Sequence, residues 1–496
     1  MIQPDFQTFS RLARQGNLVP VYETYTADLL TPVGAYLRIA RAAQYSFLLE
    51  SVEGGETIGR YTFTGMNPEE VFRARGRHCT LETGGKKTHF DGNPVEELRR
   101  LTKRYRPVRV PGLPPLIAGA IGYFAYDMVR LVERIPDTGR DDVGVDDCVM
   151  MFYLGLVVFD HVQHRVWVIR NVFTDAPGTL RAKYDAAVRE IQRTRRILGG
   201  PLPRQRKARP GGRLTVRSNM TKPQFTGAVR KAKEYIRAGD VFQVVVSQRL
   251  SATTSADPFE IYRALRVVNP SPYLYFLKLD DVSVAGSSPE MLVKVQGRDA
   301  FYKPLAGTRP RGRNEKADRE LETALLADPK ERAEHIMLVD LGRNNLGRVC
   351  DYGSVKVERL MFVERFSHVM HLVSSLRGHL RESVDCFEAL MACFPAGTLS
   401  GAPKVRAMEI IDELEPTRRG IYAGAILYLD FSGNVDSCIG LRTLVAKGGK
   451  VYIQAGAGIV ADSVPEREYE ESLNKARALI SALEIAQRGR SGGRGE

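Results

Sequence analysis

The order of the expected strands and helices is the feature that most limits the fold of this chain. Near the C-terminus, four apolar segments follow one another closely, over residues 423–431, 435–439, 441–446 and 451–459. Turn residues separate some of them, at Ser432-Gly433-Asn434 and at Gly448-Gly449, as in a strand meander. Parallel sheets need a crossover, usually a helix, between successive strands, and the chain lacks a regular helix–strand alternation. We therefore expect an α+β protein with antiparallel sheets wrapped by helices.

A basic segment rich in Gly and Pro separates two halves of the chain. Nine Lys or Arg and no acidic residue lie between Arg193 and Arg217. This composition is typical of a solvated linker between folded units. We expect four parts in chain order: an N-terminal domain over residues 1–198, a linker over 199–212, a second domain over 213–487, and a disordered Gly- and Arg-rich tail over 488–496.

The formal net charge of +14 raises the question of a nucleic-acid partner. The sequence has no recognition-helix pattern, no RNA-binding aromatic motif and no zinc-finger spacing, and its most basic stretch, from Arg193 to Arg217, has the composition of a linker. We therefore expect no nucleic-acid partner. A general positive field would instead attract a small anionic substrate.

The sequence also indicates where the chain resides. No apolar run reaches the ~18 to 20 residues that a membrane helix needs, and the N-terminal segment lacks the basic-then-apolar layout of a signal peptide. The six cysteines form no C-x-x-C pair, which argues against a zinc site and against a disulfide framework. We expect a cytoplasmic protein with no membrane partner.

The segment PEREYEESLNK near the C-terminus is expected to form a helix with an acidic face. Ser463 and Glu466 have the S-x-x-E spacing of a capping box, which predicts a helix start. Glu468, Glu471 and Lys475 then follow at i, i+3 and i+7. This spacing places the three side chains on one face of the helix.

A second helix repeats the carboxylate spacing. Asp328-Pro329 predicts a helix start, and Glu331 and Glu334 follow with an i, i+3 separation. Two carboxylate pairs suit a hard divalent cation, and Mg²⁺ binds one or two carboxylates together with water and substrate oxygens. Each pair also has a structural explanation: Glu331 completes its helix cap, or Glu471 pairs with Lys475.

Four further segments are typical of backbone that approaches a ligand, because they combine glycines with a hydroxyl or an Arg. Their structural alternatives are a flexible connection, a bulge and a surface ion pair. The segments are residues 396–404 (AGTLSGAPK), 304–312 (PLAGTRPRG), 440–442 (GLR) and 456–458 (GAG).

These segments recur together in one family. The chain carries, in the family's order, the motifs SSPEM, PLAGTRPRG, ERAEHIMLVDLGRNN, VMHLVS, FPAGTLSGAPK, GIYAGAI, CIGLRT, AGAGIV and ESLNKA. Over about residues 6–486 it resembles the chorismate-utilising enzymes, and most closely their aminating members, the large subunits of anthranilate synthases. The resemblance implies two antiparallel β-sheets packed face to face with helices on the outside. That fold agrees with the strand order above.

The resemblance also implies a lyase reaction of tryptophan biosynthesis. Ammonia adds to C2 of the chorismate ring as the C4 hydroxyl leaves, and pyruvate is then eliminated to give anthranilate. The hydroxyl needs a proton donor, and the ring carboxylate needs charge neutralisation, which Mg²⁺ supplies. By the resemblance, Glu334 and Glu471 are direct magnesium ligands, and Glu331 and Glu468 act through water.

Other residues take their expected roles from their places in these motifs. Glu290 in SSPEM resembles the general acid, and His371 in VMH resembles the residue that handles the proton during pyruvate elimination. Tyr422, Arg442 and Gly458 resemble the groups that hold the pyruvyl carboxylate. Gly307, Thr398 and Lys475 resemble the positions around the ring carboxylate and the metal, and Thr308 and Gly456 are further substrate-binding positions by the resemblance.

Two positions distinguish between the reactions of this family. Water-adding members carry a Lys base where this chain has Gln243, and glutamine cannot act as that base. Aminodeoxychorismate synthases of folate synthesis often carry a Lys nucleophile where this chain has Ala306. Both positions favour ammonia as the nucleophile. Component I of aminodeoxychorismate synthase remains the alternative, because some of its members lack that Lys.

A regulatory site is implied by the N-terminal half. Leu48-Leu49-Glu50-Ser51 resembles the LLES motif that binds tryptophan in feedback-inhibited large subunits, although a buried strand would also explain the pattern. The residues that resemble the rest of the site are Asn269, Pro272, Tyr273, Leu274 and Cys438.

The expected partner is a second protein. The chain has no glutaminase motif, in which a Cys in a Gly-rich turn is followed by a His and an acid. The resemblance therefore implies a separate glutamine amidotransferase subunit that delivers ammonia, in a heterotetramer of two large and two small subunits.

Overall fold

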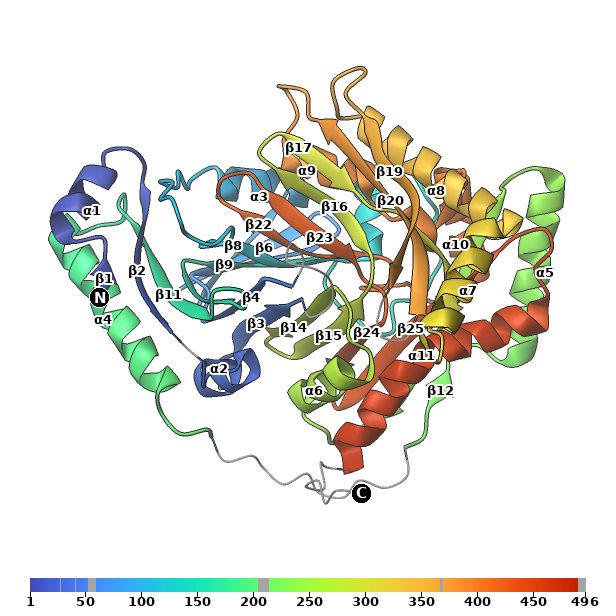
Figure 1. Cartoon of the computed structure of the whole chain (residues 1–496), viewed down its shortest axis with the longest axis horizontal. Coiled ribbons are helices and arrows are strands. Elements are labelled where there is room, and N and C mark those ends of the chain that lie inside the picture. Colours follow the sequence, from blue (N-terminus) through green and yellow to red (C-terminus); the bar gives the residue numbers. More distant parts are fainter. Residues whose placement is uncertain (27, 41, 52–58, 204–213, 366–368, 489–496) are drawn as a thin grey trace.

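Figure 1 shows the computed structural model of the chain, which describes residues 1–26, 28–40, 42–51, 59–203, 214–365 and 369–488. Most of the expected linker over residues 199–212 lies outside these ranges, and so does the expected tail after residue 488.

In the described residues the strands form two large sheets. The first has 13 strands, in the order β1 (Ile2–Gln3), β2 (Leu18–Thr26), β11 (Arg165–Phe173), β10 (Gly155–Asp160), β4 (Tyr61–Met66), β3 (Tyr45–Glu50), β14 (Tyr273–Leu279), β15 (Val282–Ser288), β24 (Thr443–Lys447), β25 (Lys450–Ile459), β13 (Gln243–Thr253) and β12 (Arg217–Ser218), with β21 (Gly401–Ala402) also on β13.

The second sheet has 12 strands within the same ranges. Their order is β18 (Leu305–Pro310), β20 (Val369–His379), β17 (Asp299–Tyr302), β16 (Met291–Gln296), β23 (Val435–Ile439), β22 (Ala425–Asp430), β8 (Gly119–Phe124), β9 (Cys148–Tyr153), β5 (Glu70–Arg75), β6 (His78–Thr83) and β7 (Lys86–Asp91), with β19 (Lys356–Arg365) also on β20. The pairings within both sheets are antiparallel, as the strand order predicts.

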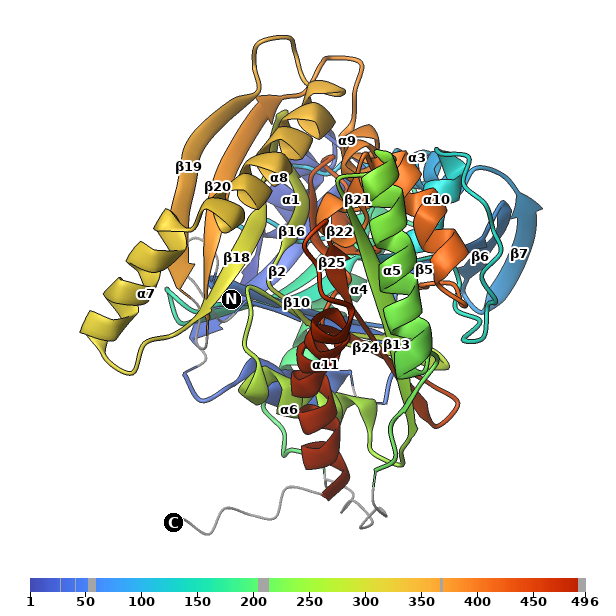
Figure 2. The same ribbon diagram turned by 90° about the vertical axis from the view of Figure 1, so that its right-hand side faces the viewer.

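The helices cover the outer faces of the sheets (Figures 1 and 2). They are α1 (Phe6–Leu12), α2 (Pro32–Ile39), α3 (Pro94–Thr102), α4 (Leu180–Leu198), α5 (Lys222–Ala238), α6 (Pro258–Val268), α7 (Glu315–Ala327), α8 (Pro329–Gly347), α9 (Cys386–Cys393), α10 (Lys404–Leu414) and α11 (Pro465–Arg488), with 3₁₀ turns η1 (Tyr126–Leu131) and η2 (Gly397–Leu399).

The two sheets pack face to face over a shared core. Phe47 of β3 belongs to the same buried cluster as Tyr123 of β8, which lies in the other sheet. Because strand side chains alternate between faces, Leu48 instead packs outward with residues of α2 and α6, and Phe124 packs outward with residues of α3 and α9. The expected architecture of two antiparallel sheets with helices outside is confirmed.

Both sheets run through the two halves of the chain. In the first sheet, β3 pairs with β14 in a register that places Phe47 opposite Leu277. In the second sheet, β8 pairs with β22 and Gly122 lies opposite Leu427. The N-terminal and C-terminal halves therefore share a continuous hydrogen-bonded framework.

The two acidic helices begin where the sequence predicts. Asp328 caps α8, because its carboxylate accepts hydrogen bonds from the backbone N–H groups of Lys330 and Glu331. Helix α11 starts at Pro465, but the predicted capping box does not form. The Ser463 hydroxyl accepts from the N–H of Val460, and Glu466 instead pairs with Arg230 of α5 at 3.2 Å. A local turn therefore takes the Ser463 hydroxyl, and a neighbouring helix takes the Glu466 carboxylate.

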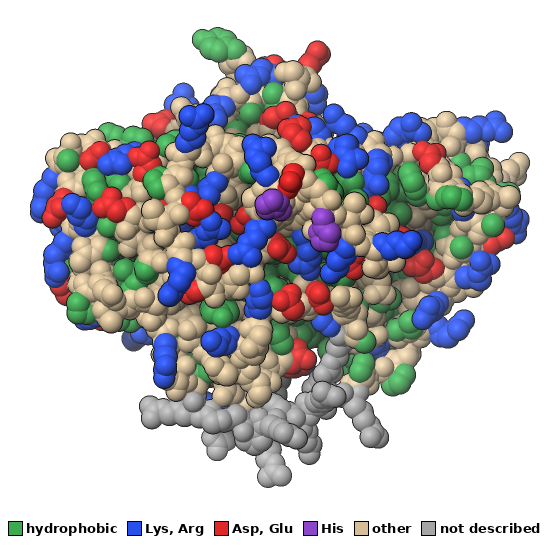
Figure 3. All heavy atoms as spheres, turned by 180° about the vertical axis from the view of Figure 1, so that it is seen from behind, with side chains coloured by type: hydrophobic (Ala, Val, Ile, Leu, Met, Phe, Trp, Pro, Cys, Tyr) green, Lys and Arg blue, Asp and Glu red, His purple; other side chains and the backbone are tan. Residues whose placement is uncertain are grey.

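Charges of both signs share the surface of the molecule. On the face opposite to that of Figure 1, Lys and Arg side chains are interspersed with Asp and Glu (Figure 3). Of the helices in the described ranges, none has the length and apolar character needed to cross a membrane.

Candidate active site

Glu290 lies in the short connection between β15 and β16, and its side chain is buried. The N–H of Ile439 donates to its carbonyl at 3.1 Å, which fixes the backbone. Burial raises the pKa of Glu290 to about 8, although the Thr398 hydroxyl and the Arg442 charge oppose the rise. The Thr398 hydroxyl thus faces Glu290 closely enough to oppose the rise, although within the described residues its oxygen has no partner at ordinary hydrogen-bond geometry. Glu290 is therefore a protonated acid at neutral pH.

His371 lies on β20 and is also buried. Its Nδ1 is 2.9 Å from the carbonyl oxygen of Gly307 and 3.1 Å from the Thr308 hydroxyl. A carbonyl only accepts hydrogen bonds, so we assign the proton to Nδ1, which leaves Nε2 as the basic atom. Burial lowers the pKa of His371 to about 4, so the ring is neutral at pH 7.

Arg442 lies near both of these groups. Its charge lowers the pKa of Glu290 and also that of His371, whose pKa is lowered mainly by burial. The expected strand over residues 441–446 begins only at Thr443, because Arg442 has a φ of 48° and ends a turn. Such a backbone conformation is strained for a non-glycine residue and often occurs at functional sites.

The Tyr422 segment is tied to the turn that carries Arg442. The N–H of Ala423 donates to the carbonyl of Gly440 at 2.9 Å, and Gly440 donates to Gly424 at 2.8 Å. Tyr422 itself is buried, and burial raises the pKa of its hydroxyl. The predicted carboxylate-binding residues Tyr422 and Arg442 therefore sit on adjacent, hydrogen-bonded turns.

The glycines of the AGAGIV motif allow two strands to approach closely. A Cβ on Gly458 would lie 2.5 Å from Nε2 of Gln243, and a Cβ on Gly456 would lie 2.6 Å from the carbonyl of Val246. Lys475 of α11 donates to the carbonyl of Gly456 at 3.2 Å. Gly456 is therefore required sterically because it meets backbone, whereas at Gly458 the end of the Gln243 side chain occupies the space of a Cβ.

The four predicted metal-binding carboxylates influence one another. Burial raises the pKa of Glu334, and the charges of Glu331 and Glu471 add to the rise. The pKa of Glu468 is raised by burial first and also by Glu471. Glu331 also lies close to the Gly307 backbone, because a Cβ at Gly307 would lie 3.0 Å from Oε2 of Glu331. Helices α8 and α11 thus bring their acidic faces to one region.

The carboxylates do not form a ready metal centre in this arrangement. Glu331 accepts from Arg309 at 3.1 Å, and Glu471 pairs with Lys475 at 2.7 Å, the structural alternative noted above. Across the described ranges, no cluster of three or more His, Cys, Asp or Glu is positioned to hold a metal ion. The donor atoms suit Mg²⁺, and the mutual repulsion at Glu334 would be relieved by a cation. Binding would require the two ion pairs to open.

A cavity of about 1120 Å³ lies between the sheets and contains most of the predicted regulatory residues. Those that line it are Leu49, Glu50, Ser51, Pro272, Tyr273, Leu274 and Cys438. Asn269 does not line it, because its side-chain amide turns to the Ser287 hydroxyl at 3.2 Å.

The Glu50 carboxylate points away from the cavity, toward the helices that cover the outer face of its sheet. It accepts a hydrogen bond of 2.5 Å from the Tyr262 hydroxyl and pairs with Arg266 at 3.0 Å, both on α6. A second carboxylate lines the cavity, that of the half-buried Asp436, which accepts from the Tyr273 hydroxyl at 3.3 Å and lies 3.5 Å from Lys294. Burial raises the pKa of Asp436.

Comparison with known proteins decides the family. A model of the chorismate binding enzymes matches residues 45–481, which is most of the chain. The chain belongs to the chorismate binding enzyme family. Anthranilate synthase component 1 of Acetivibrio thermocellus is 48% identical to this chorismate binding enzyme, over 98% of this chain and 99% of the relative. The protein of the same name from Thermus thermophilus is 47% identical, over 95% and 99%.

Solved structures agree with this assignment. Anthranilate synthase component I from Streptococcus pneumoniae superimposes with a TM-score of 0.77 at 37% identity, over 92% of this chain and 98% of that one. The menaquinone-specific isochorismate synthase from Escherichia coli has a TM-score of 0.71 at 18% identity, over 96% and 99%, and so shares the fold. The names of the full-length relatives favour anthranilate synthase over aminodeoxychorismate synthase.

Some buried or half-buried polar residues of this chorismate binding enzyme were missed by the sequence analysis. Asp436 faces the regulatory cavity, and Arg419 and Glu415 form a buried ion pair beside the Thr398 loop. A charged residue inside the strand VDSCI was a signal for Asp436. No sequence signal separates the buried Arg419 from its half-buried neighbour Arg418.

Proposed function

We propose that this chain is the chorismate-aminating component of an anthranilate synthase. It converts chorismate and ammonia to anthranilate and pyruvate, as the names of its full-length relatives indicate. The observation that best supports a mechanism is the arrangement of a protonated carboxyl group, a neutral imidazole and one guanidinium at Glu290, His371 and Arg442.

Glu290 is the acid of the first step. The C4 hydroxyl of chorismate leaves poorly unless it receives a proton. Glu290 retains its proton at pH 7 because burial disfavours the carboxylate, and it can deliver that proton to the leaving oxygen as ammonia adds at C2. The nearby Arg442 then stabilises the carboxylate that remains.

His371 is the base of the second step. Elimination of pyruvate restores the aromatic ring when the proton at C2 is removed. The Nδ1–H of His371 is held by the Gly307 carbonyl, so Nε2 carries the lone pair that accepts this proton. The transfer leaves an imidazolium whose Nδ1–H remains hydrogen-bonded to the carbonyl.

Two cations, Arg442 and Lys475, and neutral hydrogen-bonding groups bind the two carboxylates of the substrate. Arg442 and Tyr422 bind the pyruvyl carboxylate, and Gly458, which has no side chain, allows the strand backbone to approach it. Lys475, Thr398 and the backbone around Gly307 surround the ring carboxylate. Mg²⁺, held by Glu334 and Glu471 with Glu331 and Glu468 behind them, supplies charge neutralisation when bound.

The same proposal includes a partner and a regulator. The name "component 1" of the relatives implies a second component, and we propose a glutamine amidotransferase that supplies ammonia to a heterotetramer. We also propose that tryptophan binds in the cavity lined by Ser51 and Tyr273 and inhibits the enzyme.

The direct test incubates the purified chain with chorismate, Mg²⁺ and ammonium. We expect the blue fluorescence of anthranilate to rise in step with pyruvate, and tryptophan to suppress both. A product that retains its enolpyruvyl group, with no pyruvate released, would identify an aminodeoxychorismate synthase instead. Absence of any amination would contradict the proposal.

A further inference from the structure

A fully buried ion pair lies directly behind the Thr398 loop. Arg419 and Glu415 are one helical turn apart in sequence, and their side chains are 2% and 4% exposed. Two parallel bonds join them, from Nε at 2.9 Å and from Nη2 at 2.6 Å. The Glu415 oxygen that accepts from Nη2 also accepts from Ser247, whose N–H and hydroxyl both donate to it at 2.8 Å.

The rest of the Arg419 guanidinium holds the backbone of two other segments. Nη1 donates to the carbonyl of Leu399 at 2.6 Å, and Nη2 donates to that of Val245 at 2.9 Å. Leu399 follows Thr398 directly in the short turn η2. A bond to this carbonyl therefore fixes the turn that carries the Thr398 hydroxyl.

The guanidinium also lies against two tyrosine rings. Its carbon is 5.0 Å from the centre of the Tyr126 ring and 5.5 Å from that of Tyr422. Arginine is attracted to an aromatic face, so Arg419 restrains the ring of Tyr422 as well as the Thr398 turn. One side chain thus contacts two segments of the proposed substrate site.

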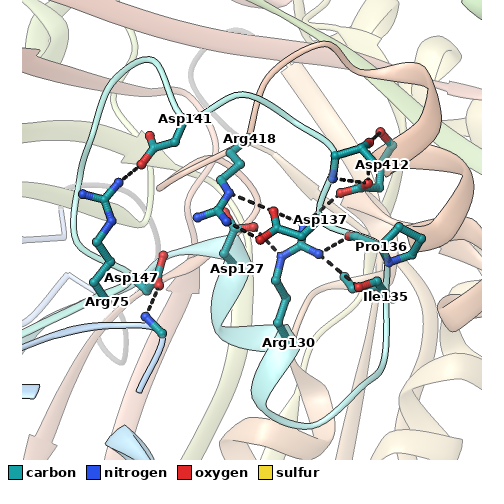
Figure 4. A network of polar contacts seen from close by, with 12 residues as sticks. Arg75, Asp127, Arg130, Ile135, Pro136, Asp137, Asp141, Asp147, Asp412 and Arg418 are labelled. Carbon is teal, nitrogen blue, oxygen red and sulfur yellow. Dashed lines mark hydrogen bonds and ion pairs between the residues drawn. The ribbon is translucent and has the colours of Figure 1, made fainter. Parts of the chain in front are cut away.

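The neighbouring residue Arg418 points away from this cluster. It pairs with Asp137, in a loop that Figure 4 shows beside the segment of Asp412. Arg130 and the Thr138 N–H, from the same N-terminal half, bind Asp412 at 2.9 Å each. The Tyr126 N–H donates to the carbonyl of Gly420 at 2.7 Å. The N-terminal half therefore holds residues 412–420 in place.

We propose that Arg419 is a positioning residue for the reaction: it fixes the Leu399 carbonyl and the Tyr422 ring, and thereby sets the Thr398 hydroxyl against Glu290. This inference rests on the proposed function, because it assumes that Thr398 and Glu290 act in that reaction. Arg419 itself contacts neither substrate nor metal in this scheme.

The geometry requires an arginine. The planar guanidinium satisfies Glu415, Leu399 and Val245 at once, whereas a lysine ammonium has three donors at a single point. A lysine here keeps the charge that Glu415 needs but loses the fork that reaches the Leu399 carbonyl. Arg419→Lys therefore tests the loss of positioning without leaving the buried Glu415 carboxylate unpaired.

The experiment is a double-mutant cycle with Thr398→Val in the full-length chain, assayed with chorismate, Mg²⁺ and ammonium. We expect Arg419→Lys to lower kcat about 10²-fold, the cost of a misplacement of about 1 Å. In the Thr398→Val background the same change should cost no more than about threefold, because the group it positions is already absent. Arg418→Lys is the matched control and should leave kcat unchanged.

A purely structural role predicts different results. Equal losses from Arg419→Lys in both backgrounds, or turnover like that of the unmodified chain, would overturn the positioning role while leaving the proposed function intact. Thr398→Val with full turnover would also overturn the positioning role, because the hydroxyl that Arg419 positions would then be dispensable. The proposed function fails only if the unmodified chain does not aminate chorismate. If Arg419→Lys is insoluble, Glu415→Gln serves in the same cycle. The glutamine NH₂ group cannot accept a hydrogen bond, so the variant loses one of the two bonds that hold the guanidinium. Equal losses in both backgrounds would again refute the proposal.

Discussion

The Nδ1 atom of His371 lies 2.9 Å from the carbonyl oxygen of Gly307, and this contact determines the tautomer of the ring. Gly307 has a φ of 65°, and the register between β18 and β20 shifts at this residue. The irregularity presents the carbonyl to the imidazole. A glycine that accepts a left-handed conformation therefore orients the base that we propose for pyruvate elimination.

Replacing His371 by Asn separates the two properties of the imidazole, which are its hydrogen bond to Gly307 and its basic nitrogen. The Asn amide retains a donor for the Gly307 carbonyl but has no basic nitrogen. We expect kcat for pyruvate release to fall by about 10²–10⁴-fold while amination continues, so that aminodeoxyisochorismate accumulates. Product analysis by mass measures both. Undiminished pyruvate release by His371→Asn would contradict this role.

The rate should depend on the protonation of Glu290. With a pKa near 8, the acid is protonated below that pH and ionised above it, so kcat/KM should decrease as the pH rises through about 8. The assay holds free ammonia constant at each pH. Glu290→Gln should be slower by about 10²–10⁴-fold and should lose this decrease. An unmodified chain whose rate keeps rising to pH 10 would exclude Glu290 as the acid.

The same residue makes a prediction about stability. Its pKa is raised from 4.5 in the folded chain, so the stabilisation it contributes below 4.5 is lost as the pH rises to about 8. The free energy of unfolding of Glu290→Gln, relative to the unmodified chain, should therefore increase between those pH values. Denaturant titrations at several pH values measure this difference, and a pH-independent difference would argue against the burial effect.

Magnesium should act through the acidic faces of α8 and α11. We expect Mg²⁺ to raise the thermal unfolding temperature of the unmodified chain, because it relieves repulsion at Glu334. Glu334→Gln should abolish both this shift and the activity while the chain still folds. Glu320→Gln, an exposed carboxylate on α7, is the control. Full turnover of Glu334→Gln in EDTA would refute the metal assignment.

Inhibition by tryptophan should depend on the cavity between the sheets. Ser51 lines this cavity, so Ser51→Phe fills part of it with a ring and should relieve inhibition with little change in kcat. Dose–response curves with tryptophan measure the effect. Ser251→Phe, at a surface serine on β13, should remain inhibited. A Ser51→Phe chain as sensitive as the unmodified one would rule out this site.

The shared sheet framework predicts a strong effect on stability at Gly122. A Cβ there would lie 1.8 Å from the carbonyl oxygen of Val149 in the paired strand. Gly122→Ala should therefore reduce soluble expression and lower the unfolding temperature. Gly227 in α5 has nothing within 4 Å of such a Cβ, and Gly227→Ala should stabilise the chain by about 0.5–1 kcal/mol. Equal unfolding temperatures for the two variants would contradict this argument.

Local rules predicted the strands and helices well and the caps less well. The start of α8 at Asp328 and Pro329 followed from its own residues. At α11 the start was correct, but Glu466 found Arg230 of another helix instead of the predicted cap. The strand expected from residue 441 was shortened because the turn at Arg442 binds the strand edge of Ser287. Tertiary contacts compete with local ones wherever a side chain is long enough to reach a neighbour.

The sequence by itself determined the antiparallel sheets, the helix faces and the motifs of the site, because these depend on periodicity and on residues a few positions apart. Only the tertiary structure decided which polar groups are desolvated and which partners they meet. Glu50 pairs with Tyr262 across 212 positions, and Arg419 is buried while Arg418 is not. Burial and pairing set the charge of each group, and both depend on elements that are distant along the chain.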